Sequence, residues 1–356
     1  VHGTVPKDKQ VKALSEKIKE GLVGGIIFFG YNIVNPTQTK KLTQHFKNIS
    51  TPHPLLLAID QEGGRVQRLN AKKGFKDFQS AKEMVEMCQD MAQADYEDMA
   101  AMTKKAGFNV VFGPVVDLDH HPEGGPVNPV IGGLNRAYSD DPEIITRYAS
   151  AFIQAHHLHG LLTSLKHFPG HGLAPSDTHI NLTDITKTYE EDLELAPYRA
   201  LKTQGLIDMV MTAHVMMRNL DADNPATLSP VIIKELLRNE GYDGVVITDD
   251  LFMGAIQKNY EFKDIVLKAI EADVDILLFS INHAAQKGIN AEDQKPIDGQ
   301  LVENIIKIVE EAIAMKRLSV DRIEKSYARI VKMKAKLTKG FKIPPQSLDI
   351  IKCSDS

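Results

Sequence analysis

The sequence predicts an α/β fold, a (β/α)8 TIM-type barrel built as a single domain. Three observations lead to this prediction. Short apolar runs alternate with longer amphipathic stretches along the chain of 356 residues. The apolar runs are nearly continuous, which is typical of strands that are covered on both faces in a parallel sheet. Strands and helices that alternate in this way indicate βαβ crossovers.

Seven segments are expected to be strands, and helices are expected between them. The expected strands are 25–29, 54–60, 109–114, 161–167, 207–214, 244–249 and 275–280. The expected helices are 10–21, 36–48, 81–107, 142–160, 189–204, 230–239, 262–272, 300–316 and 319–337. Gly160, Gly205 and Gly241 stand where a helix C-terminus is expected. A closed barrel needs an eighth strand, which we expect ahead of Val1. We expect the barrel to occupy residues 1–340 and a short tail to follow at 341–356.

Composition excludes some classes of function. The formal net charge of −5 argues against a general polyanion binder, so we expect no nucleic-acid partner. No apolar run approaches the roughly 18 residues of a membrane span. The two cysteines are too few for a disulfide framework, and we expect both to be thiols. We expect a cytoplasmic protein; a secreted or periplasmic location stays open because the sequence starts without methionine.

Polar residues follow five of the predicted strands. The carboxyl ends of barrel strands meet at one rim, where functional groups gather. A single polar residue there is best explained as a cap of the next helix, but five such strand ends indicate a polar pocket. These residues are Asp60 with its neighbours to Arg65, Asp117 and Asp119, Lys166 and His167, His214, and Asp249 and Asp250.

The densest polar segment is KHFPGHG at 166–172, followed by SDTH at 176–179. Its glycines and proline predict a sharply turned loop. Asp177 and His179 are two residues apart, so both side chains face the same way in an extended loop. A carboxylate that orients an imidazole suits general acid/base catalysis. His171, between two glycines, is expected to brace the loop.

A zinc site is the alternative interpretation of this cluster. Its ligands would be His167, His171, His179 and Asp249. The chain contains no H-E-x-x-H motif and no H-x-H at a strand end, so we expect no metal and no cofactor.

Asp249 and Asp250 end the sixth predicted strand. A carboxylate at a buried strand end is desolvated unless it has partners, which indicates a specific role. One of the two could act as a nucleophile while the other caps the next helix. Their spacing does not decide which.

These motifs together resemble glycoside hydrolase family 3, and in particular its bacterial β-N-acetylglucosaminidase (NagZ-like) branch. The segments that carry the resemblance are KHFPGHG at 166–172 with DTH at 177–179, DQEGGRVQR at 60–68 and ITDDLFM at 247–253. The similarity extends along nearly the whole chain. Where relatives read roughly IGxRSF, this sequence has IGGLNRAY at 131–138, one residue longer before the arginine.

The resemblance implies residue roles. Asp249 is then the nucleophile and Asp250 its structural neighbour. His179 is the acid/base and Asp177 its partner. The residues that match the family's sugar-binding positions are Asp60, Arg68, Arg136, Lys166 and His167.

The function implied is that of a retaining exo-β-N-acetylglucosaminidase with a covalent glycosyl-aspartate intermediate. Its expected partner is a carbohydrate with terminal β-GlcNAc, such as a peptidoglycan-derived muropeptide. The alternatives are a family 3 enzyme with another β-glycoside preference or with phosphorolytic activity, a metal-dependent hydrolase, and a barrel that binds sugar without catalysis.

Overall fold

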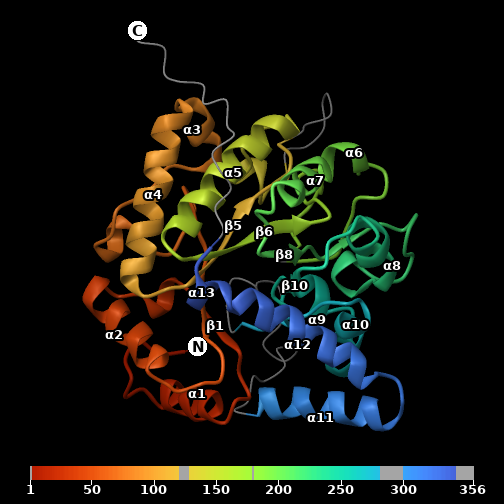
Figure 1. Ribbon diagram of the computed structural model, residues 1–356. Helices are drawn as coiled ribbons and strands as arrows, with labels where there is room; N and C mark the ends of the chain where they lie inside the picture. The colour runs from red at the N-terminus through yellow and green to blue at the C-terminus, as the bar shows by residue number, and fades with distance from the viewer. Residues whose placement is uncertain (1, 120–127, 179, 281–299, 342–356) are drawn as a thin grey trace.

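The computed structural model describes residues 2–119, 128–178, 180–280 and 300–341. Six parallel strands form its central sheet, in the order β1-β2-β5-β6-β8-β10. Their bounds are β1 Gly25–Phe28, β2 Leu56–Ile59, β5 Val110–Val115, β6 Leu162–Phe168, β8 Met209–Thr212 and β10 Val245–Thr248. The sheet curls into a half-barrel with helices around it (Figure 1). The predicted α/β class and the parallel sheet are therefore confirmed.

The seventh predicted strand, 275–280, does not form a full strand. It makes one parallel bridge, between Ile276 and Ile247 of β10. The Thr248 hydroxyl accepts a hydrogen bond from Leu278 N at 2.9 Å. A side-chain oxygen therefore replaces the backbone carbonyl that would accept this bond in a regular parallel pair. Among the described residues no strand closes the sheet between this segment and β1. The complete eight-stranded barrel stays a prediction.

Every predicted helical segment contains helix. The long helices are α1 Lys9–Lys19, α2 Pro36–Lys47, α4 Gln89–Ala106, α5 Pro142–Leu158, α7 Ala196–Thr203, α10 Phe262–Glu271, α11 Leu301–Ala314 and α12 Val320–Lys334. The short ones are α3 Ala81–Glu86, α6 Glu191–Glu194, α8 Pro230–Ile233, α9 Gly254–Gln257 and α13 Lys336–Lys339. The three predicted C-terminal glycines have φ between 67° and 84° at residues 160, 205 and 241, a conformation that favours glycine at a helix end.

The helix predicted over 81–107 is broken in two. Met87 and Cys88 are extended, with ψ near 150°, and they separate α3 from α4. The apolar spacing runs on across the break, which explains why the sequence did not reveal it. Cys88 is disulfide-bonded, so the expectation of a thiol there is wrong. Cys353 lies outside the described residues.

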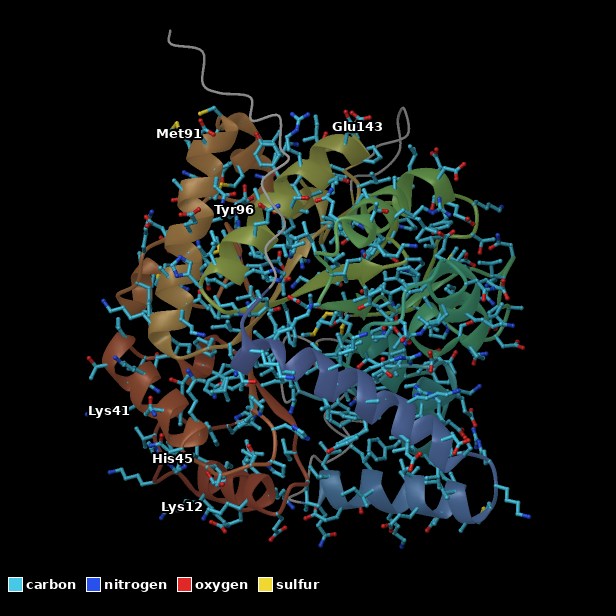
Figure 2. The ribbon with its side chains drawn as sticks, viewed as in Figure 1. Lys12, Lys41, His45, Met91, Tyr96 and Glu143 are labelled. Atoms are coloured by element: carbon cyan, nitrogen blue, oxygen red, sulfur yellow. The ribbon has the colours of Figure 1, made fainter. Side chains whose placement is uncertain are left out.

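Two apolar layers cover the sheet. The outer layer packs the sheet against helices such as α4 and α5, where the Tyr96 ring meets Phe152 edge-on at 5.2 Å. Figure 2 shows Tyr96 in the interior, whereas Lys12 and Lys41 lie on the outside of α1 and α2. The inner layer consists of residues from all six strands together with Met333 of α12. Burial on both faces explains the continuous apolar runs of the strands.

Helix α12 covers the amino end of the half-barrel. Lys334, near its end, donates a hydrogen bond to Gly24 O just before β1, at 2.8 Å. In Figure 1 the helix crosses in front of the sheet between β1 and β10. The carboxyl ends of the strands are therefore the end at which a site can open. No helix of the described residues is both long and apolar enough to cross a membrane.

Candidate active site

Strand geometry brings three predicted site residues to one face of the sheet. Side chains alternate between the two faces of a strand. In β2, β6 and β10 the residues that face the inner layer are Leu56 and Ala58, Leu162, and Val245 and Ile247. Counting forward from these positions in steps of two residues gives Asp60, Lys166 and Asp249, which therefore lie on the same face. The same period that fills the inner core therefore turns these three polar side chains toward the opening at its carboxyl end.

Asp60 lies between two cations. Its Oδ2 accepts a hydrogen bond from Arg68 Nη2 at 2.8 Å, and its Oδ1 lies 3.2 Å from Lys166 Nζ. Arg68 reaches this point because the chain turns back after β2 in an antiparallel pair, β3 Gln61–Gly63 and β4 Val66–Gln67. Burial raises the pKa of the Asp60 carboxyl, but Lys166 and Arg68 outweigh burial and lower the pKa below its usual value. Asp60 is therefore an ionised acceptor.

Glu62 extends this network to Arg136. Arg136 donates from both Nε and Nη2 to the two carboxyl oxygens of Glu62, each at 2.8 Å. Lys166 Nζ also lies 2.5 Å from Glu62 Oε1. Burial raises the pKa of Glu62, but Arg136 and Lys166 lower it to about 2 overall. The bidentate pair fixes Arg136 and Lys166 relative to each other, as a planar guanidinium allows.

Asp117 organises the start of the loop after β6. Its Oδ2 accepts from His167 Nδ1 at 2.7 Å, and its Oδ1 accepts from the backbone amides of His167 and His171 at 3.0 and 2.9 Å. The carboxylate is fully buried. Burial raises its pKa, but His167 and the other donors outweigh burial, so the pKa is lowered. An ionised Asp117 leaves the Nε2 edge of His167 as the edge available to a ligand.

His171 braces the same loop, as expected. Its Nε2 lies 3.0 Å from the hydroxyl of Thr178, the residue after Asp177. Burial lowers the pKa of His171 to about 4, so the ring is neutral at pH 7. Gly172 allows the loop to approach the segment after β5 closely, because a Cβ at this position would lie 1.9 Å from Leu118 O.

Asp249 and Asp250 have different surroundings. Asp250 is 6 % exposed, and its Oδ1 accepts from the amides of Phe252 and Ser280 at 3.0 and 2.9 Å. Burial, together with the charge of Asp249, raises the pKa of Asp250 to about 7. Asp249 is partly exposed, and its Oδ1 accepts from the Asp250 amide at 2.7 Å. Asp250 is thus a buried structural carboxyl, and Asp249 is the one that faces the opening.

The predicted residues therefore fall into connected groups. Arg68, Asp60, Lys166 and Arg136 form one network through Glu62. His167 belongs to the Asp117 group. Asp177 lies in the described part of the loop, beside the Thr178 that His171 holds. His179 lies outside the described residues. The assigned roles of all these residues stay predictions.

Two carboxylates of the predicted polar rim, Glu62 and Asp117, received no role from the sequence. Glu62 is the third residue of the DQEGGR motif, and Asp117 ends the apolar run NVVFGPVV. Both positions follow a predicted strand, which is the signal that placed them at the rim. Their cationic partners lie 50 to 104 residues away in the sequence, so spacing alone could not assign them.

The described part of the chain shows no group of three or more His, Cys, Asp and Glu side chains arranged to hold a metal ion. His167 and His171 instead both bind Asp117, one through its ring and both through their amides. This arrangement suits hydrogen bonding to a polar ligand.

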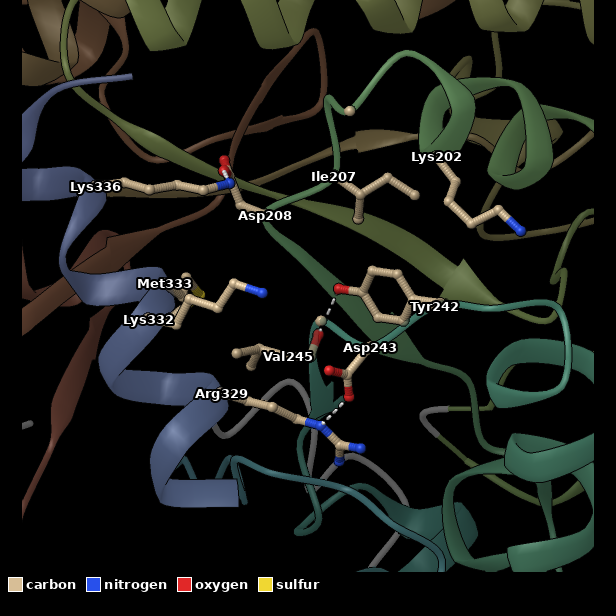
Figure 3. Close-up of a pocket in the computed structure, with 12 residues that line it drawn as sticks. Lys202, Ile207, Asp208, Tyr242, Asp243, Val245, Arg329, Lys332, Met333 and Lys336 are labelled. Atoms are coloured by element: carbon tan, nitrogen blue, oxygen red, sulfur yellow. Dashed lines mark hydrogen bonds and ion pairs between the residues drawn. The ribbon is translucent and has the colours of Figure 1, made fainter. Parts of the chain in front are cut away.

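A separate cavity of about 260 Å³ lies at the opposite end of the sheet, at the amino ends of β8 and β10 (Figure 3). Its wall is held by polar contacts: Lys336 Nζ lies 2.7 Å from Asp208 Oδ1, and the Tyr242 hydroxyl donates to Val245 O at 2.9 Å. No residue of the predicted site lines this cavity. The candidate chemistry therefore belongs to the carboxyl end of the sheet.

Residues 4–333 match the family model described as the glycosyl hydrolase family 3 N terminal domain. The chain belongs to glycosyl hydrolase family 3. The expected family and the expected class, a glycoside hydrolase, are thereby confirmed.

Curated relatives include named β-hexosaminidases. Beta-hexosaminidase from Pseudomonas aeruginosa strain UCBPP-PA14 is 37% identical over 241 residues, which cover 65% of this chain and 67% of the relative. Beta-hexosaminidase A from Pseudoalteromonas piscicida is 32% identical over 347 residues, which cover 91% of this chain. The match spans only 55% of the length of that second relative.

Solved structures share the fold. The β-N-acetylhexosaminidase from Beutenbergia cavernae DSM 12333 matches with a TM-score of 0.81 at 26% identity, covering 94% of this chain and 95% of that one. A family 3 β-N-acetylglucosaminidase from Paenibacillus sp. str. FPU-7 matches with a TM-score of 0.79 at 31% identity. That match covers 100% of this chain and 64% of the Paenibacillus chain.

Proposed function

We propose that this protein is a retaining exo-β-N-acetylglucosaminidase that removes terminal β-GlcNAc. The observation that supports the proposal most directly is the contrast at the end of β10. Asp249 is partly exposed at the carboxyl end of β10, whereas Asp250 is buried and hydrogen-bonded to backbone amides. A nucleophilic carboxylate needs access to the sugar, and only the first of the two has it. The names of the curated relatives support the same sugar.

In this mechanism Asp249 attacks the anomeric carbon while His179 protonates the leaving oxygen, and Asp177 orients that histidine. A covalent glycosyl-aspartate forms, and His179 then deprotonates the water that releases the sugar with retained configuration. The Asp250 amide, which donates to Asp249 Oδ1, holds the nucleophile in one orientation. We also propose that the complete domain is a closed (β/α)8 barrel over residues 1–340.

The binding residues have chemistry that suits a sugar. Asp60 is an ionised acceptor for paired hydroxyls, and Lys166 and Arg68 are donors within reach of the same carboxylate. We propose that these three, with Arg136 and His167, hold the hydroxyls and the acetamido group. The proposed natural substrate is a GlcNAc-terminated muropeptide, which rests on the family resemblance alone.

The primary test compares 4-nitrophenyl β-GlcNAc with 4-nitrophenyl β-glucoside, with and without phosphate. Turnover of the GlcNAc substrate without phosphate supports the proposal. Preference for glucose would indicate another β-glycoside specificity, and turnover that requires phosphate would indicate phosphorolysis. No turnover of either substrate would indicate a sugar-binding barrel. Activity that EDTA abolishes would favour a metal-dependent hydrolase.

The second test locates the nucleophile. Asp249→Ala is expected to abolish turnover, and trapping with a 2-fluoro sugar is expected to label Asp249 in a peptide mass map. Asp250→Ala is the matched control, which removes the neighbouring carboxyl. Label on Asp250 would reverse the assignment.

A further inference from the structure

Glu194, at the end of α6, lies against the loop that follows β6. The side chain is 1 % exposed. Its carboxyl touches the backbone at Gly170, where an added Cβ would lie 2.2 Å from Glu194 Oε2 and 2.4 Å from its Cδ. Only glycine fits over the carboxyl at this separation. The loop and the Glu194 side chain are therefore shaped to each other.

Other buried polar atoms surround this carboxyl. The hydroxyls of Tyr189 and Tyr198 and both oxygens of Glu194 are inaccessible, and apart from a weak interaction of the Glu194 carboxyl with the Leu118 amide they have no hydrogen-bond partner among the described residues. Tyr198 packs edge-on against Phe168, the last residue of β6, at 5.3 Å. Buried polar groups without partners are costly and therefore uncommon. Such a cluster next to the loop after β6 indicates a role beyond packing.

Two carboxyls share this region, and their pKa values are shifted in opposite directions. Asp117 accepts three hydrogen bonds from His167 and His171, which keep it ionised. Burial raises the pKa of Glu194 well above its usual value, and the charges of Asp117 and Glu190 raise it further. The nearby Leu118 amide opposes these effects but is outweighed. Of the two carboxyls, Glu194 is therefore the one whose surroundings favour the protonated form.

We propose that Glu194, through its buried carboxyl, is a positioning residue for the proposed glycosidase reaction. It contacts the loop at Gly170, while the Asp117 carboxylate accepts hydrogen bonds from the amides of His167 and His171 in the same loop. His171 then transmits this position to Thr178, next to Asp177. This inference rests on the proposed function, because the loop matters for rate only if it supplies the acid/base pair.

The test compares substrates that differ in their need for acid assistance. Wild type, Glu194→Met and Glu194→Gln are assayed with phenyl β-GlcNAc, a poor leaving group, and with 2,4-dinitrophenyl β-GlcNAc, an activated one. The measured quantity is kcat/KM, which reports the steps up to release of the first product. Glu194→Met should lower kcat/KM for the phenyl substrate by roughly 10²-fold, the effect of a catalytic group misplaced by about 1 Å. The loss should be much smaller for the dinitrophenyl substrate. Glu194→Gln keeps the shape of the side chain and its contact with Gly170, so it should remain close to wild type with both.

Two further variants control the experiment. Glu194→Asp withdraws the carboxyl from Gly170 by one methylene, so it should show the same selective loss and it replaces Glu194→Met if that variant does not fold. Tyr242→Phe removes a buried hydroxyl, bonded to Val245 O at 2.9 Å, at the opposite end of the sheet. It should leave the ratio of kcat/KM for the two substrates unchanged.

Each outcome decides the proposal. Equal losses on both substrates, or a Gln variant as impaired as the Met variant, would overturn the positioning role while the proposed function stands. Absence of turnover by the wild type on either substrate would overturn the proposed function itself, and this inference with it. A loss confined to the phenyl substrate and rescued by Gln supports both.

Discussion

Replacing Glu62 by glutamine tests the charge network of the candidate site. Glu62 is the only carboxylate among the described residues that contacts both Arg136 and Lys166. Its side chain is 7% exposed, and that of Arg136 is 10% exposed. The substitution keeps the size of the side chain and removes its charge. Arg136 then stays buried without its bidentate partner.

The magnitude follows from the pKa of Glu62, which falls from 4.5 to about 2 on folding. Each unit corresponds to about 1.4 kcal/mol, so the charged form stabilises the fold by about 3 kcal/mol. This agrees with the roughly 3–5 kcal/mol lost when one partner of a buried ion pair is removed. Because the pKa is lowered, the stabilisation is fully present above pH 4.5 and is lost as the pH falls through about 2.

Urea unfolding at pH 7 and at pH 3 measures this effect. Glu62→Gln should lower the free energy of unfolding by about 3 kcal/mol at pH 7, and by roughly half of that at pH 3. Glu271→Gln is the matched control, because Glu271 pairs with Arg317 at 2.6 Å on the surface and should contribute less than about 1 kcal/mol. A deficit no larger than that of the control, or a deficit equal at both pH values, would refute the reasoning.

Three further substitutions test packing and protonation. Gly172→Ala forces a Cβ against Leu118 O and should destabilise by roughly 1–3 kcal/mol in thermal unfolding, whereas Gly30→Ala, with open space around it, should not. Burial lowers the pKa of His171 to about 4, so the stability it contributes is present above pH 6.5 and declines as the pH falls toward 4. The difference in free energy of unfolding between wild type and His171→Gln should therefore shrink across that range. A difference that stays constant with pH would contradict this prediction. Burial raises the pKa of Asp250 to about 7, so the stability it contributes is fully present below pH 3.8 and is lost as the pH rises to 7. The free energy of unfolding of Asp250→Asn should therefore increase relative to that of wild type over this interval. If the two free energies change with pH in parallel, the assignment is wrong.

The strands show how much of the fold could be predicted from the sequence. Six of the seven predicted strands form and pair in chain order, because strands buried on both faces leave an unmistakable run of apolar residues. The seventh forms only a bridge at Ile276, since a run of apolar residues does not reveal whether a neighbouring backbone is in place to pair with it. The break at Met87 was missed for a related reason: helical apolar spacing continues on both sides of it.

The sequence by itself determined the family, the order of the elements and the residues that follow the strands at one rim. These are local properties: hydrophobic periodicity, glycines at helix ends and short motifs. Only the tertiary structure decided the partners of those residues. It paired Arg136 with Glu62 across 74 residues of sequence and distinguished the partly exposed Asp249 from the buried Asp250. The physical reason is that charge and pKa depend on burial and on neighbours brought close by the fold, which sequence separation does not encode.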